Sequence, residues 1–214
     1  MSERWTRPAL PWPLAAANRL GELFGLHGRR TWRFDRKRLE EDARRATGLD
    51  DFGKARFYEE GLERLLDSLE ETDLTLVGRI GLRGMVVTLL MNRLLLAREL
   101  QVAPERFQTV LHPPLIILGL PRSGTTFLHR LLALDPASRA LPMWRLQRPF
   151  RPSRGPDRRQ AETKRVLALT RWLTPEIDSK HLIRFDAAEE CVWLLNSTFV
   201  SHGFWISAPV YSYV

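Results

Sequence analysis

The sequence predicts an α/β protein in which a parallel sheet flanked by helices follows a helical amino-terminal section. Residues 115–118 form an aliphatic run that is apolar on both faces, as in a central parallel strand. This run leads into a turn bounded by Gly119 and Gly124, and a helical pattern opens immediately afterwards. Residues 1–110 show helical periodicity and no cofactor motif. We therefore divide the chain into a helical section, 1–110, and an α/β portion, 111–214.

The amino-terminal section is predicted to contain four helices, at residues 14–26, 35–47, 55–71 and 73–100. Asp35 is expected to cap the second helix and Gly48 to end it. The fourth carries Gly78, Gly81 and Gly84, each costing about 1 kcal/mol relative to alanine in a helix interior. We expect close packing at these glycines to offset that cost; a substrate-access role is the alternative.

The α/β portion continues with a helix over residues 124–134 and a short strand at 139–141. A loop rich in proline and arginine, 142–157, follows, and the remaining predicted helices cover 158–173 and 187–200. Asp186 and Glu189 have the spacing of a capping box at the start of the last helix. One or two strands cannot cover the edges of a parallel sheet, so the sheet is expected to be incomplete.

The composition is typical of a soluble globular protein, with 44% hydrophobic and 27% charged residues among 214. The net charge of +8 comes mainly from arginine, and it indicates either an anionic ligand or simply a solvated surface. No zinc-ligand spacing or aromatic-basic module is present, so nucleic acid is not an expected partner. Oligomeric state is not predicted.

Three features favour a cytoplasmic protein. The chain has one cysteine, Cys191, which we expect to be buried beside Val192, so no intramolecular disulfide is predicted. The apolar stretch 8–17 is short and broken by proline, unlike a secretory signal. Residues 85–97 are apolar but interrupted by Asn92 and Arg93, and a bilayer span needs about twenty residues. We expect a buried helix there and no membrane span.

The turn at residues 119–126 predicts a phosphate cradle. Gly119 and Gly124 have the spacing of the P-loop, G-x-x-x-x-G-K-[ST], which makes the predicted sheet P-loop-like. Thr125 replaces the P-loop lysine, Thr126 occupies the Ser/Thr position, and Arg122 is the cation within the loop. No later aliphatic strand ends in the aspartate that a magnesium site would need, which disfavours a metal-dependent kinase or ATPase. A plain strand-turn-helix capped by Ser123 or Thr125 is the bland alternative.

The loop resembles a known family. Gly-Leu-Pro-Arg-Ser-Gly-Thr-Thr at 119–126 is similar to the 5′-phosphosulfate loop of sulfotransferases, which use 3′-phosphoadenosine 5′-phosphosulfate (PAPS) as donor. The run Leu-His-Arg-Leu-Leu-Ala-Leu-Asp-Pro at 128–136 resembles the bacterial-type branch of that family. Residues 92–94 and the Glu-Glu-Cys run at 189–191 support the resemblance, which spans about residues 60–214.

The resemblance implies specific site residues. The donor-binding residues would be Pro121, Arg122, Ser123, Gly124, Thr125, Thr126 and Phe127. Sulfuryl transfer depends on positioning and electrostatics, so no metal is expected, and Arg122 would contact the bridging or leaving oxygen. The acceptor's proton requires a base, for which the candidates are His181, Glu189 and Glu190. Glu189 also has the capping box as an alternative role.

The resemblance also has implications for the acceptor and for the extent of the enzyme that the chain represents. The acceptor is expected to be a small molecule with a hydroxyl or amine group. Related enzymes grip the donor's 3′-phosphate with a later strand-helix unit, and nothing after Ser207 resembles it. We therefore expect an amino-terminal portion of a longer enzyme. Two alternatives stay open: a degenerate P-loop phosphotransferase, and an inactive truncated nucleotide-binding remnant.

Overall fold

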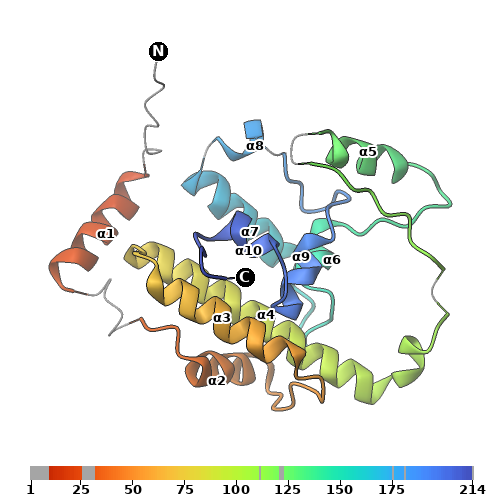
Figure 1. The fold of residues 1–214 in the computed structure, drawn as a ribbon, viewed down its shortest axis with the longest axis horizontal. Helices are drawn as coiled ribbons and strands as arrows, with labels where there is room; N and C mark the ends of the chain where they lie inside the picture. The colour runs from red at the N-terminus through yellow and green to blue at the C-terminus, as the bar shows by residue number, and fades with distance from the viewer. Residues whose placement is uncertain are drawn as a thin grey trace.

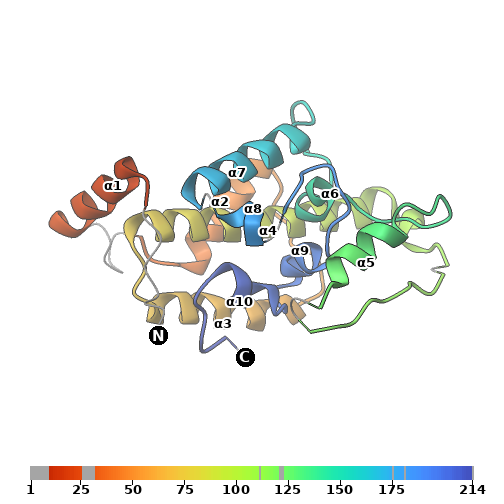
Figure 2. The same cartoon turned by 90° about the horizontal axis from the view of Figure 1, so that it is seen from above.

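A computed structural model describes residues 10–25, 32–110, 112–120, 123–174, 176–180 and 182–213. Within these ranges the protein is helical (Figures 1 and 2). The helices are α1 Trp12–Leu23, α2 Arg36–Thr47, α3 Phe57–Glu71, α4 Leu76–Val102, α5 Thr125–Leu132, α6 Met143–Gln147, α7 Arg159–Leu173, α8 Ile177–Lys180, α9 Val192–Leu195 and α10 Gly203–Ser207. Two short 3-10 helices, η1 Pro104–Phe107 and η2 Asn196–Thr198, connect some of them.

The four predicted amino-terminal helices are present, with bounds that differ from the predicted ones by up to three residues. Asp35 caps α2 by accepting a hydrogen bond from the Arg38 amide at 3.0 Å, and Gly48 ends α2 in the left-handed region at φ 68°. The fourth helix begins after Thr75 rather than at Asp73. The Thr75 hydroxyl oxygen accepts from the Gly78 amide at 3.2 Å, which satisfies one of the free amides of the first turn.

The close packing predicted at the glycines of α4 is wrong for two of the three. A Cβ added at Gly81 or Gly84 would meet nothing within 4 Å. Close approach occurs in α3 instead, where a Cβ at Gly61 would lie 2.1 Å from the Phe199 carbonyl oxygen. Glycine is therefore required where α3 meets the carboxyl-terminal segment, and not along the middle of α4.

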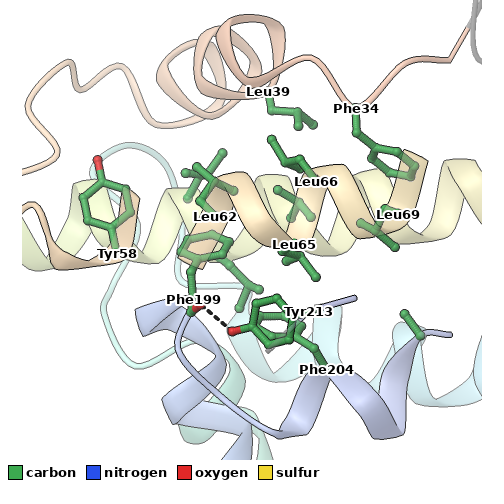
Figure 3. Packing of buried hydrophobic residues seen from close by; sticks show 14 of the residues in the cluster. Phe34, Leu39, Tyr58, Leu62, Leu65, Leu66, Leu69, Phe199, Phe204 and Tyr213 are labelled. Carbon is green, nitrogen blue, oxygen red and sulfur yellow. Dashed lines mark hydrogen bonds between the residues drawn. The ribbon is translucent and has the colours of Figure 1, made fainter. Parts of the chain in front are cut away.

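The main core joins helices α2, α3 and α4 to the last described residues of the chain (Figure 3). Leucines of α3 lie between Leu39 of α2 and three aromatic side chains of the last segment: Phe199, Phe204 and Tyr213. The buried Tyr213 hydroxyl donates to the Phe199 carbonyl at 2.5 Å and accepts from the Ser201 amide at 3.1 Å. Segments from both sides of the predicted boundary at residue 110 thus contribute to one hydrophobic cluster.

Helix α4 is long and apolar enough to cross a membrane by length and composition. Its side chains Val86, Leu90 and Leu94 are instead packed in the core, as predicted for a buried helix over 85–97. Its polar groups also have protein partners: Asn92 Nδ2 donates to the Gln147 carbonyl at 2.8 Å and to the Ser197 hydroxyl at 3.0 Å. These contacts are those of a core helix.

The predicted strands are not formed in the described ranges. Residues 112–120 run as an extended segment along one side of the molecule towards α5, and no ladder is assigned to them (Figures 1 and 2). Leu115 and Leu118 are 77% and 88% exposed. A strand needs a neighbouring strand for its backbone hydrogen bonds, and none is described beside this segment. The strand predicted at 139–141 is also absent, and an isolated antiparallel bridge pairs Pro142 with Ala188.

Two further expectations about the carboxyl-terminal part are wrong. The helix predicted over 187–200 begins only at Val192, because residues before it bond to another segment: the Met143 amide donates to the Ala187 carbonyl at 3.1 Å. The Cys191 side chain is exposed rather than buried, since it lies at the amino end of α9 and not on its inner face. The loop predicted over 142–157 also contains helix α6.

Candidate donor-binding site

The loop before α5 closes on itself through Ser123. The Ser123 amide donates to the Leu120 carbonyl at 3.2 Å, and its hydroxyl donates to the same oxygen at 2.7 Å. The Ser123 amide, one of the predicted phosphate ligands, is therefore used within the turn. Pro121 and Arg122, also predicted to bind the donor, lie outside the described residues.

The geometry of the loop explains why glycine occupies positions 119 and 124. A Cβ at Gly119 would lie 2.7 Å from both Ser123 Oγ and Thr125 Cγ2, so the end of the extended segment folds tightly over the start of α5. Gly124 has φ 89°, a conformation that side-chain-bearing residues rarely adopt. The two glycines therefore permit a compact turn directly in front of a helix.

The amino terminus of α5 has no side-chain cap among the described residues. The Ser123 hydroxyl donates to the Leu120 carbonyl and does not cap α5. The alternative of a plain helix cap at Ser123 is therefore wrong for the described chain. The first amides of an α-helix have no acceptor within the helix, and the helix dipole places partial positive charge there. An anion is the natural partner for such a terminus.

The acidic pair after α8 lies against α5. Glu190 Oε1 accepts a hydrogen bond from the Thr126 hydroxyl at 2.6 Å. The buried Glu189 side chain forms an ion pair with Arg130, with 3.4 Å between Arg130 Nη2 and Glu189 Oε2. Thr126 and Arg130 are four residues apart and therefore lie on one face of the helix. The two carboxylates thus contact α5 one turn apart.

These contacts replace the capping box predicted for Glu189. Its backbone amide donates to the Leu141 carbonyl at 3.2 Å, and its carboxylate faces Arg130 rather than a helix terminus. Arg130 also donates to the Leu182 carbonyl at 2.7 Å. Arg130 is not among the site residues predicted from the sequence. Its position one helical turn after Thr126 was the signal available there.

The segment that carries the acidic pair is itself anchored. The Trp144 amide donates to the Phe185 carbonyl at 3.0 Å, and Arg171 of α7 donates to the Ile183 carbonyl at 2.6 Å. Segment 182–190 therefore joins α5 to α6 and α7. His181, the third candidate base, lies outside the described residues.

Two comparisons with known proteins gave matches to one family. The sequence profile of the sulfotransferase family matches residues 113–214, which include the loop, α5 and the acidic pair. The chain is also similar to the crystal structure of sulfotransferase STF1 from Mycobacterium tuberculosis H37Rv, with 31% identity and a TM-score of 0.65 over 85% of this chain and 51% of that one. Residues 113–214 of the chain belong to the sulfotransferase family.

A second solved relative of this sulfotransferase family member is STF9 from Mycobacterium avium, with 25% identity and a TM-score of 0.69. The match covers 83% of this chain and 47% of that one, so the chain spans about half the length of these solved relatives. No curated protein matches the chain. The solved relatives are sulfotransferases with the P-loop-like α/β fold, whereas the described residues of this chain form no strand.

The described residues include part of the donor site that the sequence predicts. The structure brings together Ser123, Gly124, Thr125 and Thr126 at the start of α5, and it places Glu189 and Glu190 against that helix. Phe127 is also predicted to bind the donor. Its side chain is 74% exposed, and its backbone amide lies in the first turn of α5, where amides have no acceptor within the helix. The roles of all these residues stay predictions.

Proposed function

We propose that the chain carries the phosphosulfate-binding part of a sulfotransferase that moves a sulfuryl group from PAPS to a hydroxyl or amine acceptor. The observation that carries the proposal is the uncapped start of α5 behind a two-glycine turn, with an acidic residue bonded to its first turn. Membership of the sulfotransferase family supports the reaction type.

The donor would be held by its 5′-phosphate at the start of α5. The amides from Gly124 to Phe127 lie in the first turn, and the Thr125 side chain lies beside the loop at Gly119. In this proposal Arg122 contacts the oxygen that bridges phosphorus and sulfur. The guanidinium would stabilise the charge that develops there as the sulfuryl group leaves.

The transfer is an in-line displacement at sulfur. The acceptor's oxygen or nitrogen forms a bond to sulfur, and the bond from sulfur to the bridging oxygen breaks. The electron pair of the broken bond stays on the 5′-phosphate, which leaves as part of 3′-phosphoadenosine 5′-phosphate. The acceptor's proton passes to the base and then to water. No electron is gained or lost overall.

Of the two described candidates, Glu190 suits the base better than Glu189. Glu190 is half-buried and contacts the first turn of α5 through Thr126. Glu189 is fully buried, and its carboxylate already has a charged partner in Arg130. His181 remains the third candidate. A cytoplasmic location is also part of this proposal, because the donor is a nucleotide of the cell interior and the chain has a single cysteine.

Radiolabelled PAPS tests the proposal. We expect the chain to transfer the labelled sulfuryl group to the acceptor and to release 3′-phosphoadenosine 5′-phosphate. The turnover rate should be the same with and without a metal chelator. Arg122→Ala should lower turnover by about a hundredfold, as expected for loss of one charge-stabilising donor. Arg165→Ala, an exposed arginine of α7, is the matched control and should leave turnover unchanged. Equal turnover in the parent and Arg122→Ala would remove Arg122 from the mechanism.

The same assay separates the alternatives. Magnesium-dependent hydrolysis of a nucleoside triphosphate, with no turnover of PAPS, would indicate the degenerate P-loop phosphotransferase. Binding of 3′-phosphoadenosine 5′-phosphate without any turnover would indicate the inactive remnant.

A further inference from the structure

Two anionic groups could accept a hydrogen bond from the Thr126 hydroxyl: the Glu190 carboxylate and the 5′-phosphate of the proposed donor. In the structure it donates its proton to Glu190 Oε1 at 2.6 Å. Under the proposed function, the same hydroxyl belongs to the set that binds the donor's 5′-phosphate. A threonine hydroxyl has a single O–H donor, so it cannot serve both anions at once.

We propose that Glu190 competes with the donor for the Thr126 hydroxyl, so that donor binding releases the Glu190 carboxylate for the acceptor. This inference rests on the proposed function and adds an order of events to it. Without donor, the carboxylate is held against α5. With donor bound, the hydroxyl turns to the phosphate, and Glu190 loses its partner on Thr126 at the moment when a base is needed.

The surrounding contacts make this exchange local. Arg130, one turn further along α5, binds both the Glu189 carboxylate and the Leu182 carbonyl. The Glu189 amide is in turn bonded to the Leu141 carbonyl. These bonds tie the residues before Glu190 to α5 and to the segment before α6. The exchange therefore requires rotation of two side chains and no movement of α5 relative to segment 182–190.

Electrostatics set the direction of the effect. A carboxylate held beside an anion site repels the incoming anion, and it also occupies a donor group that the anion needs. Replacing Glu190 with glutamine removes the charge and keeps the size of the side chain. The neutral amide oxygen accepts the Thr126 proton less strongly, because hydrogen bonds to ionised groups are about twice as strong as neutral ones. Donor-type anions should then bind more tightly.

A double-mutant cycle on ligand binding tests the competition. Calorimetric titration with 3′-phosphoadenosine 5′-phosphate would compare the parent chain, Glu190→Gln, Thr126→Val and the double variant. We expect Glu190→Gln to tighten binding about tenfold when Thr126 is present. In the Thr126→Val background the same change should tighten binding by less than about threefold, because only through-space repulsion is left to remove.

The controls address folding and general charge effects. Thr126→Ser keeps the hydroxyl and should preserve the tenfold effect of Glu190→Gln. Asp186→Asn removes a carboxylate from the same segment, one that pairs with Arg184 and not with α5, and should leave binding unchanged. Thermal unfolding of each variant would show that it folds. If Thr126→Val does not fold, the comparison of Glu190→Gln in the parent and Thr126→Ser chains with Asp186→Asn decides the question.

The outcomes separate this inference from the proposed function. Equal tightening by Glu190→Gln with and without the Thr126 hydroxyl, or no tightening at all, overturns the competition while leaving the donor assignment intact. If 3′-phosphoadenosine 5′-phosphate binds to no variant, the donor assignment fails, and the cycle is repeated with inorganic phosphate. If Glu190→Gln tightens phosphate binding only when the Thr126 hydroxyl is present, the competition is supported without the donor assignment. If the two substitutions act independently, or if phosphate does not bind, the competition is overturned.

Steady-state kinetics supply a readout that a merely structural role would not give. Glu190→Gln should lower the KM for PAPS, because the competitor is weakened, and also lower kcat, because the base is lost. A raised KM would contradict the inference.

Discussion

At the scale of single residues, the loop before α5 is defined by what its glycines permit. Gly119 allows the extended segment to approach Ser123 and Thr125, and Gly124 adopts a positive φ that turns the chain into the helix. The two positions act by different means, one steric and one conformational. Together they leave the amino terminus of α5 without a side-chain cap in the described chain.

Gly119→Ala is expected to weaken anion binding more than it weakens the fold. The added methyl group would lie 2.7 Å from Ser123 Oγ and Thr125 Cγ2, so the loop must open to accommodate it. Gly119 is exposed, and its replacement should cost less than about 1 kcal/mol of unfolding free energy. Binding of 3′-phosphoadenosine 5′-phosphate should fall at least about tenfold, because the amides of the first turn are displaced. Unchanged binding by calorimetry would show that the loop does not hold the anion.

At the scale of elements, helices are joined by specific polar and backbone contacts as well as by apolar packing. Thr126 and Arg130 connect α5 to the acidic pair, and Asn92 connects α4 to α6 and η2. Helix α3 approaches the backbone at Phe199 closely enough to require glycine at position 61. Each contact fixes one helix against a segment that is distant in the sequence.

Two helical glycines form a matched pair for testing this close approach. Gly61→Ala in α3 would place a methyl group 2.1 Å from the Phe199 carbonyl oxygen, and we expect a loss of about 2 kcal/mol in the free energy of unfolding. Gly81→Ala in α4 would meet no atom within 4 Å and should gain up to about 1 kcal/mol from helix propensity. Urea unfolding of both variants measures the difference. Similar effects of the two substitutions would mean that α3 does not pack against Phe199.

At the scale of the whole molecule, the core is built from segments far apart in the chain. Tyr213 lies among the side chains of α3 and the 199–204 segment, and burial raises the pKa of its phenol. The neutral hydroxyl bonds to two backbone groups, at Phe199 and Ser201. The last described residues therefore help to hold together a core that begins at Phe34.

Tyr213→Phe tests this long-range tie. The substitution keeps the ring but leaves the Phe199 carbonyl and the Ser201 amide without the hydroxyl, so we expect a loss of about 1–2 kcal/mol in the free energy of unfolding. Tyr211→Phe is the control, since that side chain is exposed and should change stability by less than about 0.5 kcal/mol. Chemical denaturation followed by circular dichroism measures both. A loss for Tyr211→Phe equal to that for Tyr213→Phe would contradict the role given to the buried hydroxyl.

At this scale, the described part of the chain also leaves an apolar surface exposed. The extended segment 115–120 and helix α5 expose several large apolar side chains: Leu115, Ile116, Leu118, Leu120, Phe127 and Leu134. The sequence pattern of residues 115–118 is that of a buried strand, yet nothing in the described chain covers it. The sequence pattern therefore predicted that residues 115–118 are apolar and extended, but it did not predict which residues surround them.

Local chemistry was readable from the sequence by itself. The Asp35 cap, the Gly48 stop, the buried character of α4 and the turn between Gly119 and Gly124 depend on neighbouring residues, whose geometry is fixed by the backbone. The motif at 119–126 was specific enough to indicate the sulfotransferase family.

Contacts between distant segments were decided only by the tertiary structure. A strand requires partner strands, so residues 115–118 have the right pattern and still form no sheet in the described chain. Glu189 has the spacing of a helix cap, but its buried carboxylate forms an ion pair with Arg130 instead. Glu190 meets Thr126 across 64 positions of the chain. Such pairings depend on how helices pack in space, which short-range sequence patterns do not encode.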